Sequence, residues 1–206
     1  MDIIKKLAEE LNIGRHQAEA AVKLIDEGNT IPFIARYRKE ATGSLDDEVL
    51  RNLDERLKYL RNLEERKNQV IASIAEQEKL TPELERSIRD AQTLVAVEDL
   101  YRPYKPKRRT RAMIAKEKGL EPLADLISMQ MVKEPLLQAA AAYISQEKGV
   151  ETAEDAIQGA KDILAERISD NAEYRTYIRN ATMNKGVVQS SAKDEKAQSV
   201  YEMYYN

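Results

Sequence analysis

The residues best suited to binding chemistry form one short basic segment. Between Arg102 and Arg111 the chain places six basic side chains and no acidic one, although its formal net charge is -3. Pro103 and Pro106 lie in the same segment, and a proline restricts its own backbone and that of the preceding residue. The segment is therefore predicted to be a stiffened, extended loop over residues 102–110 that holds its cations in water.

An extended basic loop can contact the phosphates of DNA or RNA with little sequence preference, and tyrosines such as Tyr101 and Tyr104 can stack on a base or sugar. The candidate nucleic-acid-binding residues of the loop are Arg102, Tyr104, Lys105, Lys107, Arg108, Arg109 and Arg111. Two alternatives stay open. The cations can bind carboxylates of a neighbouring domain or of the acidic helix at 151–173, within a stretch from 145 to 173 that holds eight acids and three bases. A short basic run can also be a targeting signal.

A second basic cluster lies on or beside a short predicted helix that begins near Thr30. Its cations are Arg36, Arg38 and Lys39. In one interpretation the cluster adds to the nucleic-acid-binding face. In the other, Phe33, Ile34 and Tyr37 anchor the element, while the cations are solvated or pair with the three acids at 46–48.

The sequence predicts no catalysis, no cofactor and no metal site. The chain has no cysteine and one histidine, His16, which is expected on the surface. Adjacent acids at 46–47 open a predicted helix, where carboxylates usually cap backbone amides. The acids at 98–99 precede the basic loop, which keeps them ionised and unsuited to general acid catalysis. The protein is therefore not expected to be an enzyme.

Scarce glycine and proline favour an all-α fold, an irregular scaffold around one long central helix. That helix is predicted over residues 45–80, about 50 Å long, because no glycine or proline interrupts it and leucines recur every three or four residues. Ser44 is its predicted cap, and the charged residues from Arg51 to Lys67 are assigned to its solvent face. The buried stripe is expected to contain Leu50, Leu53, Leu57, Leu60, Leu63, Val70, Ile71 and Ile74.

Threonines mark further helix starts. The predicted caps are Thr81, Thr93, Thr110 and Thr152, the last in a capping box. We expect three parts: residues 1–80 with the long helix, a helix-turn-helix-like unit over 81–125 with the basic loop as its turn, and helices over 126–206 that pack back on the scaffold. The apolar residues 201–205 suggest that the chain stops before another domain. Without a membrane-length apolar run or cysteine, a cytoplasmic protein is expected.

Several strings resemble the N-terminal region of the bacterial Tex family of transcription accessory proteins. They are PFIARYRKEATG at 32–43, EDLY at 98–101, PYKPKRRT at 103–110 and GLEPLA at 119–124. The resemblance covers essentially the whole chain. One departure is Glu78, which stands where the family pattern has glycine, near the expected end of the long helix.

The resemblance implies a helical region with a helix-turn-helix-like unit, in a protein associated with nucleic acid and the transcription machinery. It also implies downstream domains that this chain lacks: a ribonuclease-H-like domain, a helix-hairpin-helix segment and an S1-type domain. Two functions therefore remain from the sequence. The chain contributes to nucleic-acid binding, or it is a scaffold that docks proteins or its own downstream domains.

Overall fold

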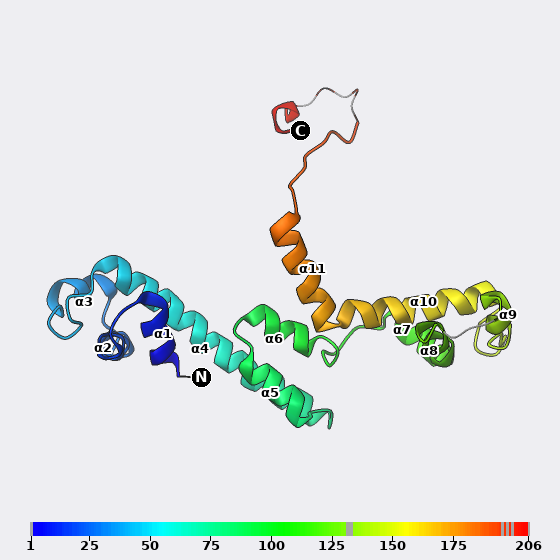
Figure 1. Cartoon of the computed structure of the whole chain (residues 1–206), viewed down its shortest axis with the longest axis horizontal. Helices are drawn as coiled ribbons and strands as arrows, with labels where there is room; N and C mark the ends of the chain where they lie inside the picture. Colours follow the sequence, from blue (N-terminus) through cyan, green and yellow to red (C-terminus); the bar gives the residue numbers. More distant parts are fainter. Residues whose placement is uncertain (1, 131–133, 195, 197, 199, 206) are drawn as a thin grey trace. The chain divides into compact units, whose positions relative to one another are not determined.

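The computed structural model describes residues 2–130, 134–194, 196, 198 and 200–205. These residues form eleven α-helices and one short 3-10 helix, with no β-strand among them, which confirms the all-α prediction (Figure 1). None of the helices described is both long and apolar enough to cross a membrane. The elements are α1 Ile3–Leu11, α2 Arg15–Asp26, α3 Ile31–Tyr37, α4 Asp47–Glu76, α5 Pro82–Asp90, α6 Leu94–Tyr101, α7 Arg111–Glu117, α8 Glu121–Ser128, α9 Leu136–Ala141, α10 Ala153–Asp170, α11 Ala172–Lys185 and the 3-10 helix Glu202–Tyr204.

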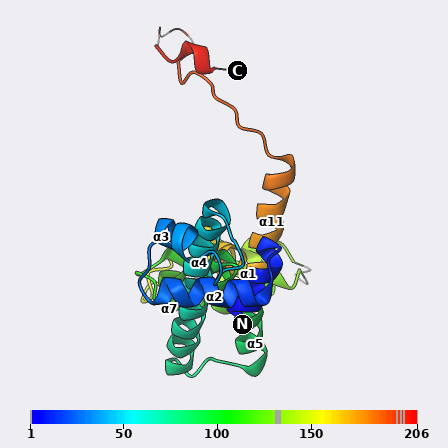
Figure 2. The ribbon, with the colours of Figure 1, turned by 90° about the vertical axis from the view of Figure 1, so that its left-hand side faces the viewer.

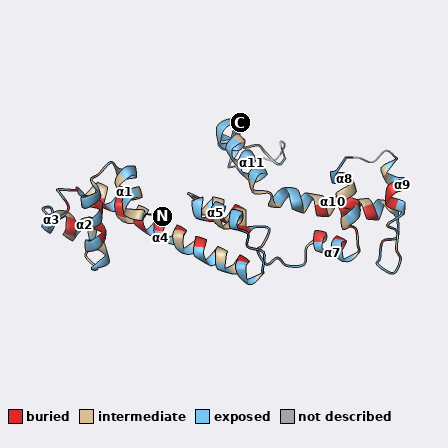
Figure 3. Ribbon diagram, turned by 60° about the horizontal axis from the view of Figure 1, so that its bottom comes forward, coloured by how far each residue is buried: buried red, intermediate tan, exposed pale blue. Residues whose placement is uncertain are grey.

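The chain divides into two compact units, which we call the N-terminal unit, Met1–Tyr104, and the C-terminal unit, Lys105–Asn206. The N-terminal unit is built on α4, whose 30 residues span about 45 Å. Its buried leucines recur every three or four residues and so lie along one side of the helix (Figure 3). The long central helix is thus confirmed, with slightly shorter ends than predicted.

Two clusters of apolar side chains use different stretches of α4. Helices α1, α2 and α3 pack against its first half, around Leu50, Leu53 and Leu57 (Figures 1 and 2). Helices α5 and α6 pack against its second half, around Val70 and Ile74. Burying each such side chain contributes about 1.5–3 kcal/mol relative to exposing it, so both clusters hold their helices to the same long support.

The C-terminal unit is built on α10. Helices α7, α8 and α9 pack on it, and small residues such as Ala112, Ala156 and Ala160 are buried in their contacts. Small side chains let helix backbones approach closely. Helix α11 follows α10 and packs only weakly on it, and none of its residues is buried (Figure 3).

Residues 81–125 do not pack as one body. Helices α5 and α6 bury their apolar faces on α4, whereas α7 and α8 bury theirs on α10. The predicted helix-turn-helix-like unit is therefore not confirmed, because its helices pair with two different long helices. The structure groups the chain into two units, rather than into the parts 1–80, 81–125 and 126–206, and the boundary after Tyr104 falls inside the basic loop.

The helix caps follow the sequence closely, with one exception. The hydroxyl groups of Thr81, Thr93, Thr110 and Thr152 accept hydrogen bonds from backbone amides three residues on, as predicted. The prediction for Ser44 is wrong: Ser44 has a positive φ of 65°, and Asp46 caps α4 by accepting from the amide of Val49 at 2.8 Å. The helix begins at Asp47, and Leu45 before it is buried.

Glu78, where the chain departs from the family pattern, lies at the break after α4. Glu78 has a φ of 57°, in the left-handed region that favours glycine, directly after the capping residue Gln77. The long helix therefore ends here although the chain carries no glycine at the position where the family pattern has one.

Glu10 makes the stability of the N-terminal unit depend on pH. Arg56 donates two hydrogen bonds to its carboxylate, from Nε at 2.5 Å and from Nη2 at 2.8 Å. The hydrogen bond from Arg56 lowers the pKa of Glu10 below its ordinary value of 4.5, although burial raises it. A carboxyl with a lower pKa in the folded state stabilises the fold above its unfolded pKa, and this contribution is lost as the pH falls through the folded pKa.

Glu10→Gln is therefore expected to destabilise the protein at about pH 6 and to have little effect at about pH 3. The loss at the higher pH is expected to be at most about 1 kcal/mol, because the pair is partly exposed. Urea unfolding followed by circular dichroism at both pH values measures the difference. Glu9→Gln, at the exposed neighbouring position, is the control. An equal loss for Glu10→Gln at both pH values would contradict the assignment.

Candidate nucleic-acid interface

The tyrosines at the start of the basic loop pack against the N-terminal unit. The Tyr101 side chain is buried, and its hydroxyl lies 3.0 Å from Ser73 Oγ. Tyr104 is half-buried, and its carbonyl accepts a hydrogen bond from Gln77 Nε2 at 3.0 Å. The ring of Tyr101 is therefore withdrawn from the stacking role predicted for it, while Tyr104 keeps part of its surface exposed.

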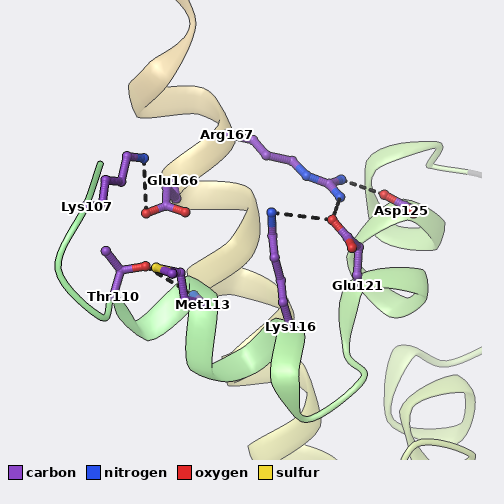
Figure 4. A network of polar contacts seen from close by, with 8 residues as sticks. All are labelled: Lys107, Thr110, Met113, Lys116, Glu121, Asp125, Glu166 and Arg167. Carbon is purple, nitrogen blue, oxygen red and sulfur yellow. Dashed lines mark hydrogen bonds and ion pairs between the residues drawn. The ribbon is translucent and has the colours of Figure 1, made fainter. Parts of the chain in front are cut away.

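Lys107 is already neutralised by the acidic helix (Figure 4). Its Nζ lies 3.3 Å from Glu166 Oε1 and donates a hydrogen bond to Asp170, one turn further along α10. Burial lowers the pKa of Lys107, but the hydrogen bonds to Asp170 and Glu166 outweigh it and raise the pKa above the ordinary 10.5. Lys107 therefore stays charged at neutral pH and anchors the loop instead of offering its charge to a ligand.

Arg109 also has a carboxylate partner. Its Nη2 lies 2.6 Å from Glu117 Oε2, with both side chains more than half exposed. An exposed ion pair contributes about 0–1 kcal/mol, so a phosphate can compete for this arginine. The predicted alternative, an acidic helix that binds the loop, thus holds for Lys107, whereas the partner of Arg109 is a residue of α7.

Three further cations of the loop have no carboxylate partner among the residues that the structure describes. They are Lys105, Arg108 and Arg111, all exposed and all in the C-terminal unit. Thr110 caps α7 between Arg108 and Arg111, with its hydroxyl accepting from Met113 N at 3.1 Å. Arg102 is exposed at the end of α6, in the N-terminal unit.

A polar network also links the helices that follow the basic loop. Arg167 of α10 donates to Asp125 at 2.5 Å and to Glu121 at 3.0 Å, both on α8. Lys116 of α7 lies 3.5 Å from the same Glu121 carboxylate (Figure 4). The network joins α7, α8 and α10, so the residues that follow the basic loop are fixed on the helix that binds Lys107.

The cluster at Arg36, Arg38 and Lys39 is exposed at the end of α3. Among the described residues no ion pair joins these cations to the acids at 46–48, so of the two states that one interpretation allowed, solvation and pairing, the structure shows solvation. Asp46 caps α4, and Asp47 binds Arg51 at 2.7 Å. Ile34 is buried, as predicted for an anchor, but the Tyr37 side chain is 66% exposed, so the prediction that Tyr37 anchors the element is wrong.

Within the N-terminal unit, the α3 cluster and the start of the basic loop lie near opposite ends of α4. Helix α3 packs at the first half of α4, whereas Tyr104 is held by Gln77, just after its last turn. Arg102 and Tyr104 therefore do not share a surface with the cluster at Arg36.

The carboxylates considered as candidates for catalysis or metal binding make structural contacts instead. Glu98 accepts from Arg66 at 2.6 Å, and Asp99 is buried beside it on α6. The acids at 46–47 lie near the other end of α4, so the two acidic pairs do not converge. His16 is exposed, as predicted.

Comparison with known proteins gives two family matches along the chain. Residues 1–75 match the Tex-like protein N-terminal domain, and residues 133–206 match the Tex central region-like family. The protein YdcI of Bacillus subtilis is 48% identical over 204 residues, which are 98% of this chain and 28% of that protein. Protein tex of Bordetella pertussis is 50% identical over 194 residues, 94% of this chain and 24% of that protein.

The Transcriptional accessory protein Tex of Neisseria gonorrhoeae is 46% identical over 196 residues, 95% of this chain and 26% of that protein. The chain thus spans about a quarter of the length of these relatives. The string at 32–43 lies within the first family match, whereas the strings at 98–124 fall between the two matches and are covered by the relatives alone. The chain belongs to the Tex family and corresponds to its N-terminal and central helical regions.

Proposed function

We propose that this chain contributes to nucleic-acid binding in a Tex-like transcriptional accessory protein. The observation that carries the proposal is the set of three exposed cations, Lys105, Arg108 and Arg111, which have no carboxylate partner among the described residues. The chain as a whole is negative, and the acids of α10 that approach the loop are already bound to Lys107. The charges of these three cations are therefore available to bind an anionic partner.

The loop is suited to a phosphate backbone. Lys107 and the cap at Thr110 fix its two sides, so little conformational entropy is lost when a ligand binds. Exposed lysine and arginine side chains contact phosphates without reading bases, which predicts weak sequence preference for DNA or RNA. The proposed role is binding without catalysis, and the proposed location of the protein is the cytoplasm.

The test is a triple charge reversal, Lys105→Glu, Arg108→Glu and Arg111→Glu. Binding to a fluorescent oligonucleotide of about 20 nucleotides is measured by anisotropy from low to physiological salt. The affinity is expected to fall on the order of 100-fold at low salt, since three contacts of about 1 kcal/mol each are removed. The slope of log K against log salt is expected to become shallower by about 2–3 units.

The matched control reverses three exposed cations that also lack an ion pair among the described residues, Lys23, Lys79 and Arg86. It changes the net charge equally but leaves the loop intact, so it separates a local site from a general electrostatic effect. Equal affinity of the loop variant and the control would refute the assignment of the loop. Circular dichroism checks that both variants are folded.

A second candidate function, a protein-interaction scaffold, is favoured by α11. This helix has no buried residue, and it exposes Tyr174, Tyr177, Ile178 and Met183. Beside its first turn lies a hollow of about 490 Å³, lined by apolar side chains such as Ile127 and Leu164 and by polar ones such as Gln130 and Arg167. Apolar surface of this kind marks interaction sites.

Under the scaffold function, the partners are the transcription machinery or further domains of the longer family members. The scaffold function predicts that the wild-type chain shows no measurable binding to either DNA or RNA at low salt. The same titration therefore decides between the two functions.

A further inference from the structure

Tyr37 presents an open aromatic face at the end of α3. Its side chain is 66% exposed, although it follows buried Ile34 by only three residues. One side of the ring is supported by Phe33, with ring centroids 5.3 Å apart and planes tilted by 43°. An exposed tyrosine held against a second ring is a platform on which a planar group can stack.

Three exposed cations lie next to Tyr37 in the sequence: Arg36, Arg38 and Lys39. The Arg38 guanidinium lies over the Phe33 ring at 5.3 Å from its centroid, and Arg36 and Lys39 have no ion pair among the described residues. Of the acids between 40 and 48, Asp46 caps α4 and Asp47 binds Arg51. Of these acids, only the carboxylates of Glu40 and Glu48 have no hydrogen-bond or ion-pair partner among the described residues.

The backbone that follows Tyr37 is held in place. Thr42 is buried, and its hydroxyl donates to the carbonyl of Arg38 at 3.2 Å. Gln17 of α2 donates to the carbonyls of Thr42 and Gly43 at 3.2 and 3.0 Å. The loop is thereby fixed to α2, so the ring and its cations are in position before any ligand arrives.

We propose that the α3 surface, formed by Phe33, Arg36, Tyr37, Arg38 and Lys39, binds single-stranded nucleic acid with an unpaired base stacked on Tyr37. Every base has a flat π-face, and proteins that bind single strands combine such aromatic platforms with cations that contact the backbone. In a duplex the base faces are covered by their neighbours, so the Tyr37 contact is available only to unpaired bases. The inference rests on the proposed nucleic-acid role but uses residues separate from the basic loop.

The test compares Tyr37→Ala with Tyr37→Phe on three probes: an oligothymidylate, an oligouridylate and a DNA duplex, each about 20 nucleotides or base pairs long. Loss of one stacking contact lowers the affinity about 5- to 150-fold. Tyr37→Ala is expected to show this loss on the single strands and none on the duplex, while Tyr37→Phe keeps the wild-type affinity. The two single strands distinguish DNA from RNA as the ligand.

Tyr177→Ala is the matched control, because Tyr177 is 75% exposed on α11. A second measurement is photocrosslinking to an oligonucleotide that carries 5-iodouracil, which reacts with a stacked aromatic ring. The adduct is expected on Tyr37 in peptide mass spectra and absent from Tyr37→Ala. Thermal unfolding confirms that each variant is folded.

The outcomes separate this inference from the proposed function. The loop triple variant can lose affinity while Tyr37→Ala binds single strands like the wild type. That result would refute base stacking on Tyr37 and would support nucleic-acid binding by the basic loop. If Tyr37→Ala weakens duplex binding as strongly as single-strand binding, stacking on an unpaired base is overturned. If the wild-type chain binds none of the probes, both fail.

Discussion

Lys67→Met is expected to lower the free energy of unfolding of the N-terminal unit by about 1–3 kcal/mol. The Lys67 side chain is only 2% exposed, and its Nζ donates to Glu64 Oε1 at 2.8 Å and to the carbonyl oxygen of Arg89 at 2.7 Å. Arg89 lies in the last turn of α5, where backbone carbonyls lack partners within the helix. Methionine fills a similar volume but leaves that carbonyl unsatisfied.

Lys67→Glu is expected to cost more, about 3–5 kcal/mol. It places a carboxylate in a buried position beside the carboxylate of Glu64. It also turns a favourable cation at the C-terminal end of α5 into an unfavourable anion, because that end of the helix dipole is negative. We therefore expect α5 to detach from α4 in this variant.

Hydrogen exchange of peptides from 82–90 measures the effect where it arises and is insensitive to the C-terminal unit. Lys58→Met is the matched control: it changes the same residue type on the same helix, but Lys58 is 72% exposed and pairs with Asp54. The control is expected to cost less than about 1 kcal/mol. Similar protection of α5 in Lys67→Met and Lys58→Met would exclude a structural role for the buried amine.

Lys67 also shows where sequence reasoning assigned a residue to the wrong face. The run from Arg51 to Lys67 was predicted to face solvent, because charged residues rarely lie in a core. Position 67 nevertheless falls four residues after Leu63 and three before Val70, so the spacing places it on the buried stripe. The helical spacing thus indicates that position 67 is buried, but the prediction followed the charge of lysine instead.

Local features of the fold could be predicted because they depend on a few neighbouring residues. Each threonine cap needs only a hydroxyl three residues before a free amide, which is why Thr81, Thr93, Thr110 and Thr152 could all be placed. Packing partners could not be predicted in the same way. The apolar residues of α5 and α7 do not indicate which helix each one packs on, and only the structure shows that α5 packs on α4 and α7 on α10.

For the candidate interface, too, the sequence predicts the general chemistry but not the individual contacts. The composition of the basic loop predicts an anionic partner, and an acidic helix was one of the partners expected. The choice among its cations depends on distances that no spacing rule supplies: Lys107 reaches two carboxylates of α10, whereas Arg108, the next residue, reaches none among the described residues. The exposure of Tyr37 was not predicted, because its spacing of three residues from Ile34 suits the buried face of α3, although the helix ends at Tyr37.

Gly159→Val is expected to destabilise the C-terminal unit by about 1–3 kcal/mol or more. Gly159 lies on the face of α10 that packs against α7, and a Cβ at this position would overlap Cδ1 of Leu120 and lie 3.3 Å from Cβ of Ala115. Leu120 is 1% exposed and cannot move aside into solvent. The gain in helix propensity on replacing glycine, at most about 1 kcal/mol, is too small to offset the overlap.

A double-mutant cycle with Leu120→Ala tests this cause directly. Leu120→Ala alone is expected to cost about 2–5 kcal/mol through the cavity that it leaves. In the double variant the new valine enters that cavity. The double variant is therefore expected to lose less unfolding free energy than the sum of the two single losses, by about 1 kcal/mol or more. Ala165→Val, on the exposed face of the same helix, is the matched control for the effect of a β-branched residue. Additive losses in the cycle, measured by urea unfolding, would show that contact with Leu120 is not what requires glycine at position 159.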